Sequence, residues 1–185
     1  MYTRLIINRN EKDLIFDDEN DIYTLTTSKN QYNNINENVS TVNLGECENI
    51  LKKKYNISNN DSLIILKLDH YEEGSPVPVI EYEVYDSKSK KKLNLELCRD
   101  IKIRINIPVL INEEESFKYN ASSEYYNDVC FTYTTKDKTD ITLEDRKKEF
   151  IDKNMSLCEP NCDYIGYDYD IKKATCDCQV KIKFP

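Results

Sequence analysis

The spacing of the seven cysteines constrains this 185-residue chain more than any other feature. Four of them form a cluster: Cys158 and Cys162 are a C-x3-C pair, and Cys176 and Cys178 follow as a C-x-C pair. Alternate residues of a strand point to the same face, so Cys176 and Cys178 can each reach an upstream cysteine. A zinc site favours C-x2-4-C knuckles, which a C-x-C pair fits poorly. The cluster therefore predicts disulfides, with bound zinc or free buried thiols as the alternatives.

The other three cysteines are spread along the chain. Cys47 and Cys98 flank the best-defined apolar segments, and a bridge between them would close a loop of about fifty residues. The chain-entropy model values such a bridge at roughly 4 kcal/mol. Because seven is an odd number, one cysteine stays unpaired or pairs with another molecule, and we assign that role to Cys130.

Acceptor triplets for N-glycosylation agree with an oxidising compartment. About twenty asparagines and a Ser/Thr fraction near one in eight predict two or three N-x-S/T triplets by chance, but five are present. Glycosylation and disulfides both belong to secreted and cell-surface proteins. The candidate acceptors are Asn38, Asn56, Asn60, Asn120 and Asn154.

Hydrophobic periodicity predicts a chain made mainly of strands. The clearest example is Ile101 to Ile107, where isoleucines alternate with Lys102, Arg104 and Asn106, as in a half-buried strand. Leu14–Phe16 and Ile22–Thr27 predict a hairpin. Further expected strands or strand-like alternations are 39–44, 62–69, 79–85, 93–97, 130–135 and 174–184.

Two short helices are expected among these strands. Residues 45–55 have acids in the first turn and lysines in the last, as the helix dipole favours. Thr142 to Asp145 is similar to a capping box and begins a helix that runs to about Asn154. We therefore expect a mainly β, β-sandwich-like fold with two short helices and a disulfide-rich C-terminal extension. The expected division is a β-rich layered domain over 1–111 and a cysteine-stapled extension or small subdomain over 112–185.

Composition excludes two classes of partner. A net charge of −8 argues against nucleic-acid binding, which needs lysine and arginine at the phosphates. No stretch approaches eighteen apolar residues, so we expect no membrane insertion within this fragment. Residues 1–8 are too short and too polar for a signal peptide, so an extracellular form is expected to be a fragment of a larger precursor.

Catalytic patterns are sparse. His70 is the single histidine, and no nucleophile elbow accompanies it, so we interpret it as a surface or capping residue. Three glycines do not supply a phosphate-binding loop, and 34 acidic residues make carboxylate pairs uninformative. The acidic and tyrosine-rich run from Asp163 to Asp170 lacks the ligand spacing of an EF-hand. We expect no cofactor, no metal and no catalysis.

Several sequence blocks together carry a resemblance. They are Ile22–Ser28, Val42–Glu48, Tyr55–Ser58, Ile80–Tyr85, Leu93–Cys98, Ile107–Val109, Tyr125–Cys130, Asp145–Phe150 and the two C-terminal cysteine pairs. This set, which covers most of the chain from about residue 20, resembles the cysteine-rich ectodomain of expanded, uncharacterised membrane-anchored surface proteins of AT-rich unicellular eukaryotes. The abundance of Asn, Lys, Ile and Tyr fits such codon usage. The resemblance implies an extracellular domain and no particular activity.

The sequence thus favours an extracellular or cell-surface glycoprotein module with a structural, adhesive or self-assembly role and a protein partner, which can be a second copy. Two alternatives remain at this point. One is a secreted enzyme of the acid-pair hydrolase type. The other is an intracellular or viral protein whose cysteines are reduced or bind zinc.

Overall fold

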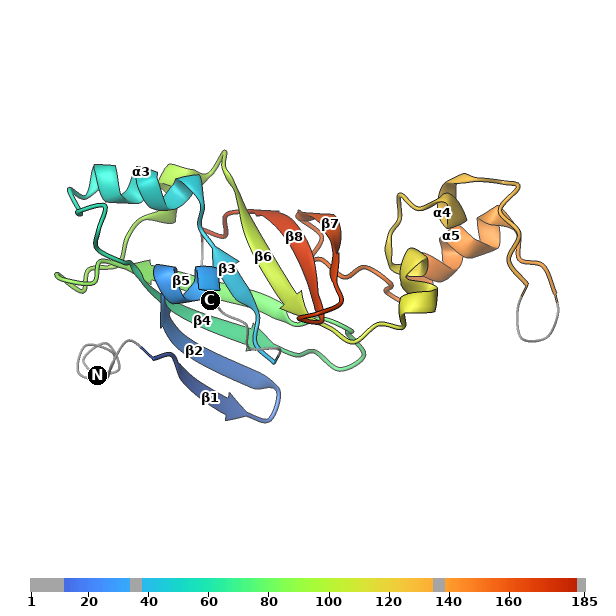
Figure 1. The fold of residues 1–185 in the computed structure, drawn as a ribbon, viewed down its shortest axis with the longest axis horizontal. Helices are drawn as coiled ribbons and strands as arrows, with labels where there is room; N and C mark the ends of the chain where they lie inside the picture. The colour runs from blue at the N-terminus through green and yellow to red at the C-terminus, as the bar shows by residue number, and fades with distance from the viewer. Residues whose placement is uncertain (1–11, 34–37, 135–138, 183–185) are drawn as a thin grey trace.

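The computed structural model describes residues 12–33, 38–134 and 139–182, and two four-stranded antiparallel sheets dominate them (Figure 1). Sheet A has the strand order β1-β2-β4-β5. The predicted hairpin is present at its edge, and the two predicted apolar strands follow. The bounds are β1 Leu14–Asp18, β2 Asp21–Thr27, β4 Ile64–His70 and β5 Val79–Tyr85.

Sheet B has the strand order β3-β6-β8-β7. Its strands are β3 Thr41–Asn43, β6 Lys102–Pro108, β7 Cys162–Asp168 and β8 Lys173–Gln179. Strand β8 pairs with β6 along its whole length, from Lys102 opposite Gln179 to Pro108 opposite Lys173. Strands from both sides of residue 112 therefore build one sheet.

Both expected helices form, and shorter ones accompany them. The expected pair are α3 Glu46–Lys54 and α5 Leu143–Asp152, and the Thr142 side chain caps α5 by accepting a hydrogen bond from the Asp145 backbone N–H. Sequence periodicity did not predict the others, which are too short for a helical pattern to show. They are α2 Ser28–Asn33, α4 Glu124–Asn127 and the 3₁₀ helices η1 Leu95–Cys98 and η2 Glu113–Tyr119.

Three strand expectations need correction. The alternation over residues 93–97 becomes η1, because the Asn94 side chain accepts a hydrogen bond from the Glu96 backbone N–H and turns the chain. Of the strand expected over 130–135, residues 130–134 form only an isolated bridge, between Thr134 and Asp140, and residue 135 lies outside the described residues. The final strand ends at Gln179, and residues 183 and 184 of the expected strand lie outside the described residues.

One hydrophobic core joins the two sheets. Ile65, Ile80, Tyr82 and Val84 of sheet A share a cluster of buried side chains with the inward residues of sheet B. The sheet B members are Val42, Ile103, Ile105, Ile107, Ala174, Cys176 and Cys178. The alternation predicted for β6 thus places its isoleucines in the core and its charged residues outside.

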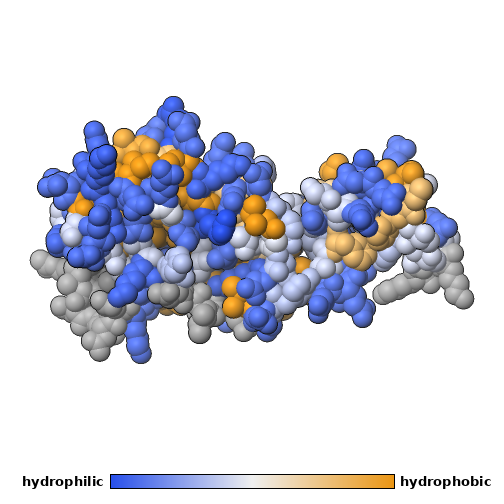
Figure 2. Space-filling model, turned by 45° about the horizontal axis from the view of Figure 1, so that its top comes forward, coloured by the Kyte–Doolittle hydropathy of each residue, from blue (hydrophilic) through white to orange (hydrophobic). Residues whose placement is uncertain are grey.

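Residues 113–134 and 139–153 form a helical lobe to one side of the sheets, at the right of Figure 1. Aromatic side chains pack its interior, with the Tyr125 ring 5.2 Å from Phe117 and 5.6 Å from Phe131, centroid to centroid. The buried Arg146 guanidinium lies 5.2 Å from the Tyr125 ring centre. Hydrophobic residues also gather on the surface of this lobe (Figure 2).

Candidate functional site

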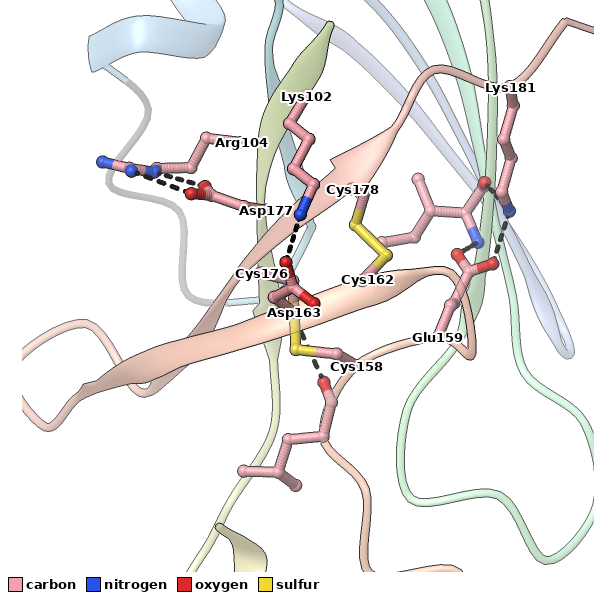
Figure 3. Close-up of a disulfide and its surroundings, with 12 residues drawn as sticks. Lys102, Arg104, Cys158, Glu159, Cys162, Asp163, Cys176, Asp177, Cys178 and Lys181 are labelled. Atoms are coloured by element: carbon pink, nitrogen blue, oxygen red, sulfur yellow. Dashed lines mark hydrogen bonds and ion pairs between the residues drawn. A yellow bond between two sulfur atoms is a disulfide. The ribbon is translucent and has the colours of Figure 1, made fainter. Parts of the chain in front are cut away.

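The four cysteines of the C-terminal cluster are all bonded in two disulfides (Figure 3). Cys176 and Cys178 both point inward from β8, two residues apart, as the C-x-C spacing requires. Cys176 bonds to Cys158, which follows α5, with the Cα atoms 5.9 Å apart. Cys178 bonds to Cys162, its register partner on β7, with the Cα atoms 4.1 Å apart.

These bridges hold Glu159 against the edge of sheet A. Strand β5 is the last strand of that sheet, so outward backbone groups of Ile80 have no neighbouring strand. The Glu159 carboxylate accepts a hydrogen bond from the Ile80 N–H at 2.9 Å, and Lys181 Nζ donates one to the Ile80 carbonyl at 2.6 Å. Glu159 and Lys181 also form an ion pair at 2.6 Å. Two side chains from the C-terminal segment thereby replace a missing strand.

The third disulfide lies outside this C-terminal cluster. Cys47 of α3 bonds to Cys98 of η1, with both side chains completely buried and the Cα atoms 5.4 Å apart. The six cysteines assigned to disulfides from the sequence are therefore the six that pair. Cys130 is unpaired and exposed, between α4 and α5 in the helical lobe.

The cysteines and acidic residues considered as metal ligands have other partners in this arrangement. The six bonded cysteines have no thiolate to offer zinc, and no group of three or more His, Cys, Asp or Glu residues in the described ranges is placed to hold an ion. In the run considered for calcium, Asp163 pairs with Lys102. Asp168 accepts hydrogen bonds from the backbone N–H groups of Asp170 and Ile171, so its carboxylate shapes a turn.

The five candidate glycosylation sites lie at or near the surface. Asn38, Asn56, Asn60 and Asn154 are exposed, and Asn120 is half-buried. Asn56 and Asn154 follow the ends of α3 and α5 and have positive φ values of 54° and 46°. In both places the next N–H bonds five residues back, from Ile57 to the Lys52 carbonyl and from Met155 to the Phe150 carbonyl. These are Schellman motifs, so both asparagines also serve to end a helix.

His70 lies at the surface, as its sequence context indicated. Its Nδ1 is 2.6 Å from the Asp21 carboxylate, and the side chain is 46% exposed. The hydrogen bond with Asp21 raises the pKa of the imidazole above its ordinary value.

A buried polar cluster was missed by sequence reasoning. Lys67 Nζ lies 2.7 Å from the Asp69 carboxylate and 2.8 Å from Ser40 Oγ, and all three residues are completely buried. The Ser40 N–H and hydroxyl both donate to Asp69, at 2.9 and 2.6 Å. Burial lowers the pKa of Lys67. The available signal was that Lys67 and Asp69 share the face of β4 that also holds Ile65, which alternation assigns to the core.

A serine hydroxyl beside a lysine amine is chemically a nucleophile with its base. Here the pair lies between the β4 strand and the segment before β3, with no exposed atom surface through which a substrate can enter. The Ser40 hydroxyl is also held by Asp69. We interpret the cluster as a structural ion pair that joins the two sheets.

Among the described residues, the surface hollows are open to solvent rather than enclosed. One of about 690 Å³ lies at the β7–β8 turn, lined by Arg104, Ile165, Tyr169, Asp170 and Thr175 among others. Arg104 is held by Asp177 through contacts of 3.0 and 3.4 Å, and Thr175 by Asn106 at 3.0 Å. These side chains are already paired within the sheet surface.

Comparison with protein families, with curated proteins and with solved structures found no match to this chain. In the described residues, no helix has the length and apolar character needed to cross a membrane.

Proposed function

We propose that the chain is an extracellular or cell-surface glycoprotein module with a structural, adhesive or self-assembly role and no catalysis. Its two sheets would act as a β-sandwich-like body, with the disulfide-bonded C-terminal strands closing it. The observation that carries the proposal is the pairing of six cysteines in three disulfides. The sequence resemblance to ectodomains of membrane-anchored surface proteins points the same way.

Disulfides support an oxidising compartment because the cytosolic thiol pool keeps such cysteines reduced. All three bridges join elements that also contact each other through the core or through the sheet, as expected of structural rather than catalytic disulfides. Two of them include a completely buried cysteine, Cys47 or Cys176, where a reductant has no direct access.

Surface positions support the glycoprotein part of the proposal. An acceptor asparagine must protrude far enough for the transferase and the attached sugar, and four of the five candidates are exposed. The strands of both sheets contain none of the five, so glycans at these sites would leave the strand faces free for contacts.

Cys130 supports the self-assembly part of the proposal. It is exposed in a chain whose other cysteines are bonded, and in an oxidising compartment such a thiol forms a bridge to a second molecule. Exposed apolar side chains occur next to it and elsewhere on the same lobe, with Val129 74% and Ile151 77% exposed. They favour contact of this lobe with another protein surface.

The test is mass spectrometry of the chain secreted from eukaryotic cells. We expect the reduced protein to be heavier by about 2 Da per bridge, six cysteines to resist alkylation until reduction, and enzymatic deglycosylation to remove hexose-containing mass from acceptor asparagines. A Cys130→Ser variant is the control for the disulfide-linked dimer seen without reductant. Six freely alkylated thiols in the native secreted protein, or a fully unglycosylated one, would overturn the respective part of the proposal.

A further inference from the structure

The outer face of sheet A, which points away from the shared core, is apolar across three strands. Register places Phe16 opposite Tyr23 and Tyr23 opposite Leu68. The neighbouring row runs from Leu14 to Leu25 and on to Leu66. These residues alternate with the core-facing ones, so they share one face of the sheet. In Figure 1 the β1–β2 hairpin lies at the bottom, away from β6 and β8.

Part of this face is open to solvent. Phe16 is 64% exposed and Tyr23 is 41% exposed. Leu25 and Ile64 are buried in a small cluster with Leu14, Leu66 and Tyr85 that is separate from the main core. A sheet face that meets only water normally carries polar residues. This one has the composition of a face that is covered.

Sheet B provides the comparison within the same molecule. Its outer face carries Lys102, Arg104, Asp163 and Asp177, joined in two ion pairs, together with Thr175. Charged and polar side chains of this kind are typical of a sheet face that is exposed to solvent. The difference between the two outer faces indicates that the apolar face of sheet A has a separate use.

Acidic groups surround the apolar rows. Asp18 and Asp21 lie at one end of them, and Glu81 and Glu83 lie opposite Leu68 and Leu66 on β5. Lys92 pairs with Glu83, but Glu81 Oε2 is buried and has no hydrogen-bond partner. A buried carboxylate oxygen without a partner destabilises the fold, and a cation from a bound molecule would supply that partner.

The size of the face limits what can cover it. Three of its strands have seven residues, which at about 3.3 Å per residue gives a length near 23 Å. Four strands about 4.8 Å apart give a flat area of roughly 300–400 Å², well below the ~800 Å² that each partner contributes to a standard interface. A helix of about 15 residues spans that length. A second copy would also set acidic rim against acidic rim, in a chain of net charge −8.

We propose that the outer face of sheet A binds an amphipathic helix of a partner protein, with an apolar stripe on Phe16, Tyr23 and Leu68 and lysine or arginine at the helix edge beside Glu81. Such a helix adds a third layer to the fold, as helices do on apolar sheet faces. This inference deepens the adhesive role proposed above by giving the chemistry of the partner. It depends on neither the disulfides nor the glycans of that proposal.

Binding is tested with dye-labelled synthetic peptides of about 15 residues, measured by fluorescence anisotropy against the full secreted chain. The first peptide has a leucine stripe with lysine edges, the second has the same stripe with glutamate edges, and the third scrambles the composition of the first. We expect saturable binding of the lysine-edged peptide alone. Phe16→Ser should weaken it about tenfold, and Glu81→Gln should weaken it severalfold and reduce its salt dependence.

Leu110→Ser and Glu96→Gln are the matched controls, since Leu110 is 81% exposed and Glu96 is exposed, and both lie outside this face. Both should bind as the parent chain does. The proposal is overturned if Phe16→Ser binds the lysine-edged peptide unchanged, or if the glutamate-edged or scrambled peptide binds equally well. It is also overturned if the parent chain sediments as a dimer that Phe16→Ser abolishes, or if binding occurs only after residues 1–11 are deleted. Either result assigns the face to another occupant, while disulfide and glycan masses test the proposed function separately.

Discussion

The Glu159 carboxylate accepts a hydrogen bond from the Ile80 backbone N–H at 2.9 Å, across 79 positions of sequence. It closes the free edge of β5 with a side chain that lies between two bridged cysteines, Cys158 and Cys162. The disulfides of the C-terminal segment therefore also hold the side chain that protects the edge of sheet A from pairing with another strand.

Glu159→Ala is expected to destabilise the chain by about 1–3 kcal/mol, because the Ile80 N–H loses its acceptor and Lys181 loses its ion-pair partner. Urea unfolding measures the change, and amide hydrogen exchange at Ile80 should accelerate selectively. Glu144→Ala, at an exposed position in the first turn of α5, is the control and should stay within about 0.5 kcal/mol. Equal effects of the two substitutions would show that the edge contact is unimportant.

Two of the disulfides should differ in their contributions to stability. Cys47–Cys98 closes 51 residues and Cys158–Cys176 closes 18, so chain entropy assigns them about 4 and about 3 kcal/mol. Paired Cys→Ser variants of each bridge, compared by denaturant midpoint at equal slope, test this order. Because both bridges also pack in the core, each variant adds a packing loss of its own. A midpoint unchanged in either double variant contradicts the structural role.

Sequence periodicity was most reliable where one face of a strand is buried. The alternation in β6 and β5 and the C-x-C pair of β8 follow directly from inward and outward positions, and the structure shows those faces. The alternation at Leu93, Leu95 and Leu97 failed, although Leu93 and Leu95 are buried. There the Asn94 cap and the bridge at Cys98 favour a 3₁₀ turn, and a two-residue period cannot distinguish the two.

Contacts between residues far apart in the chain could not be predicted from the sequence. Cysteine spacing indicated which residues form disulfides. It did not indicate that Cys158 pairs with Cys176 and that Cys162 pairs with Cys178. Strand β7 was not predicted, because the bulge between Tyr164 and Gly166 breaks its alternation. The partnership of Ser40 with Lys67 and Asp69 joins positions 27 and 29 residues apart, and no local pattern encodes it.

Substitutions at and near Asn56 can separate its role in ending α3 from its role as a candidate glycosylation acceptor. Its φ of 54° favours Asn or Gly, so Asn56→Ala should cost about 1–2 kcal/mol, while Asn56→Gly should be nearly neutral. Both remove the acceptor, and Ser58→Ala removes the triplet with the asparagine kept in place. Thermal unfolding and glycopeptide mass together distinguish the two roles. If Asn56→Gly and Ser58→Ala both destabilise the secreted protein but not the bacterially produced one, the glycan itself is the stabilising group.

His70 should titrate above 6.5, because its imidazolium is hydrogen-bonded to Asp21. A folded-state pKa above the unfolded value means that this pair stabilises the fold fully below the unfolded pKa and loses that effect as pH rises through the folded pKa. NMR follows the titration without ambiguity, since this is the single histidine of the chain. Asp21→Asn should return the pKa towards 6.5 and remove the loss of stability between pH 6.5 and the raised value, whereas Asp170→Asn at the β7–β8 turn should change neither. An unshifted titration in the parent chain would show that the 2.6 Å contact does not persist in solution.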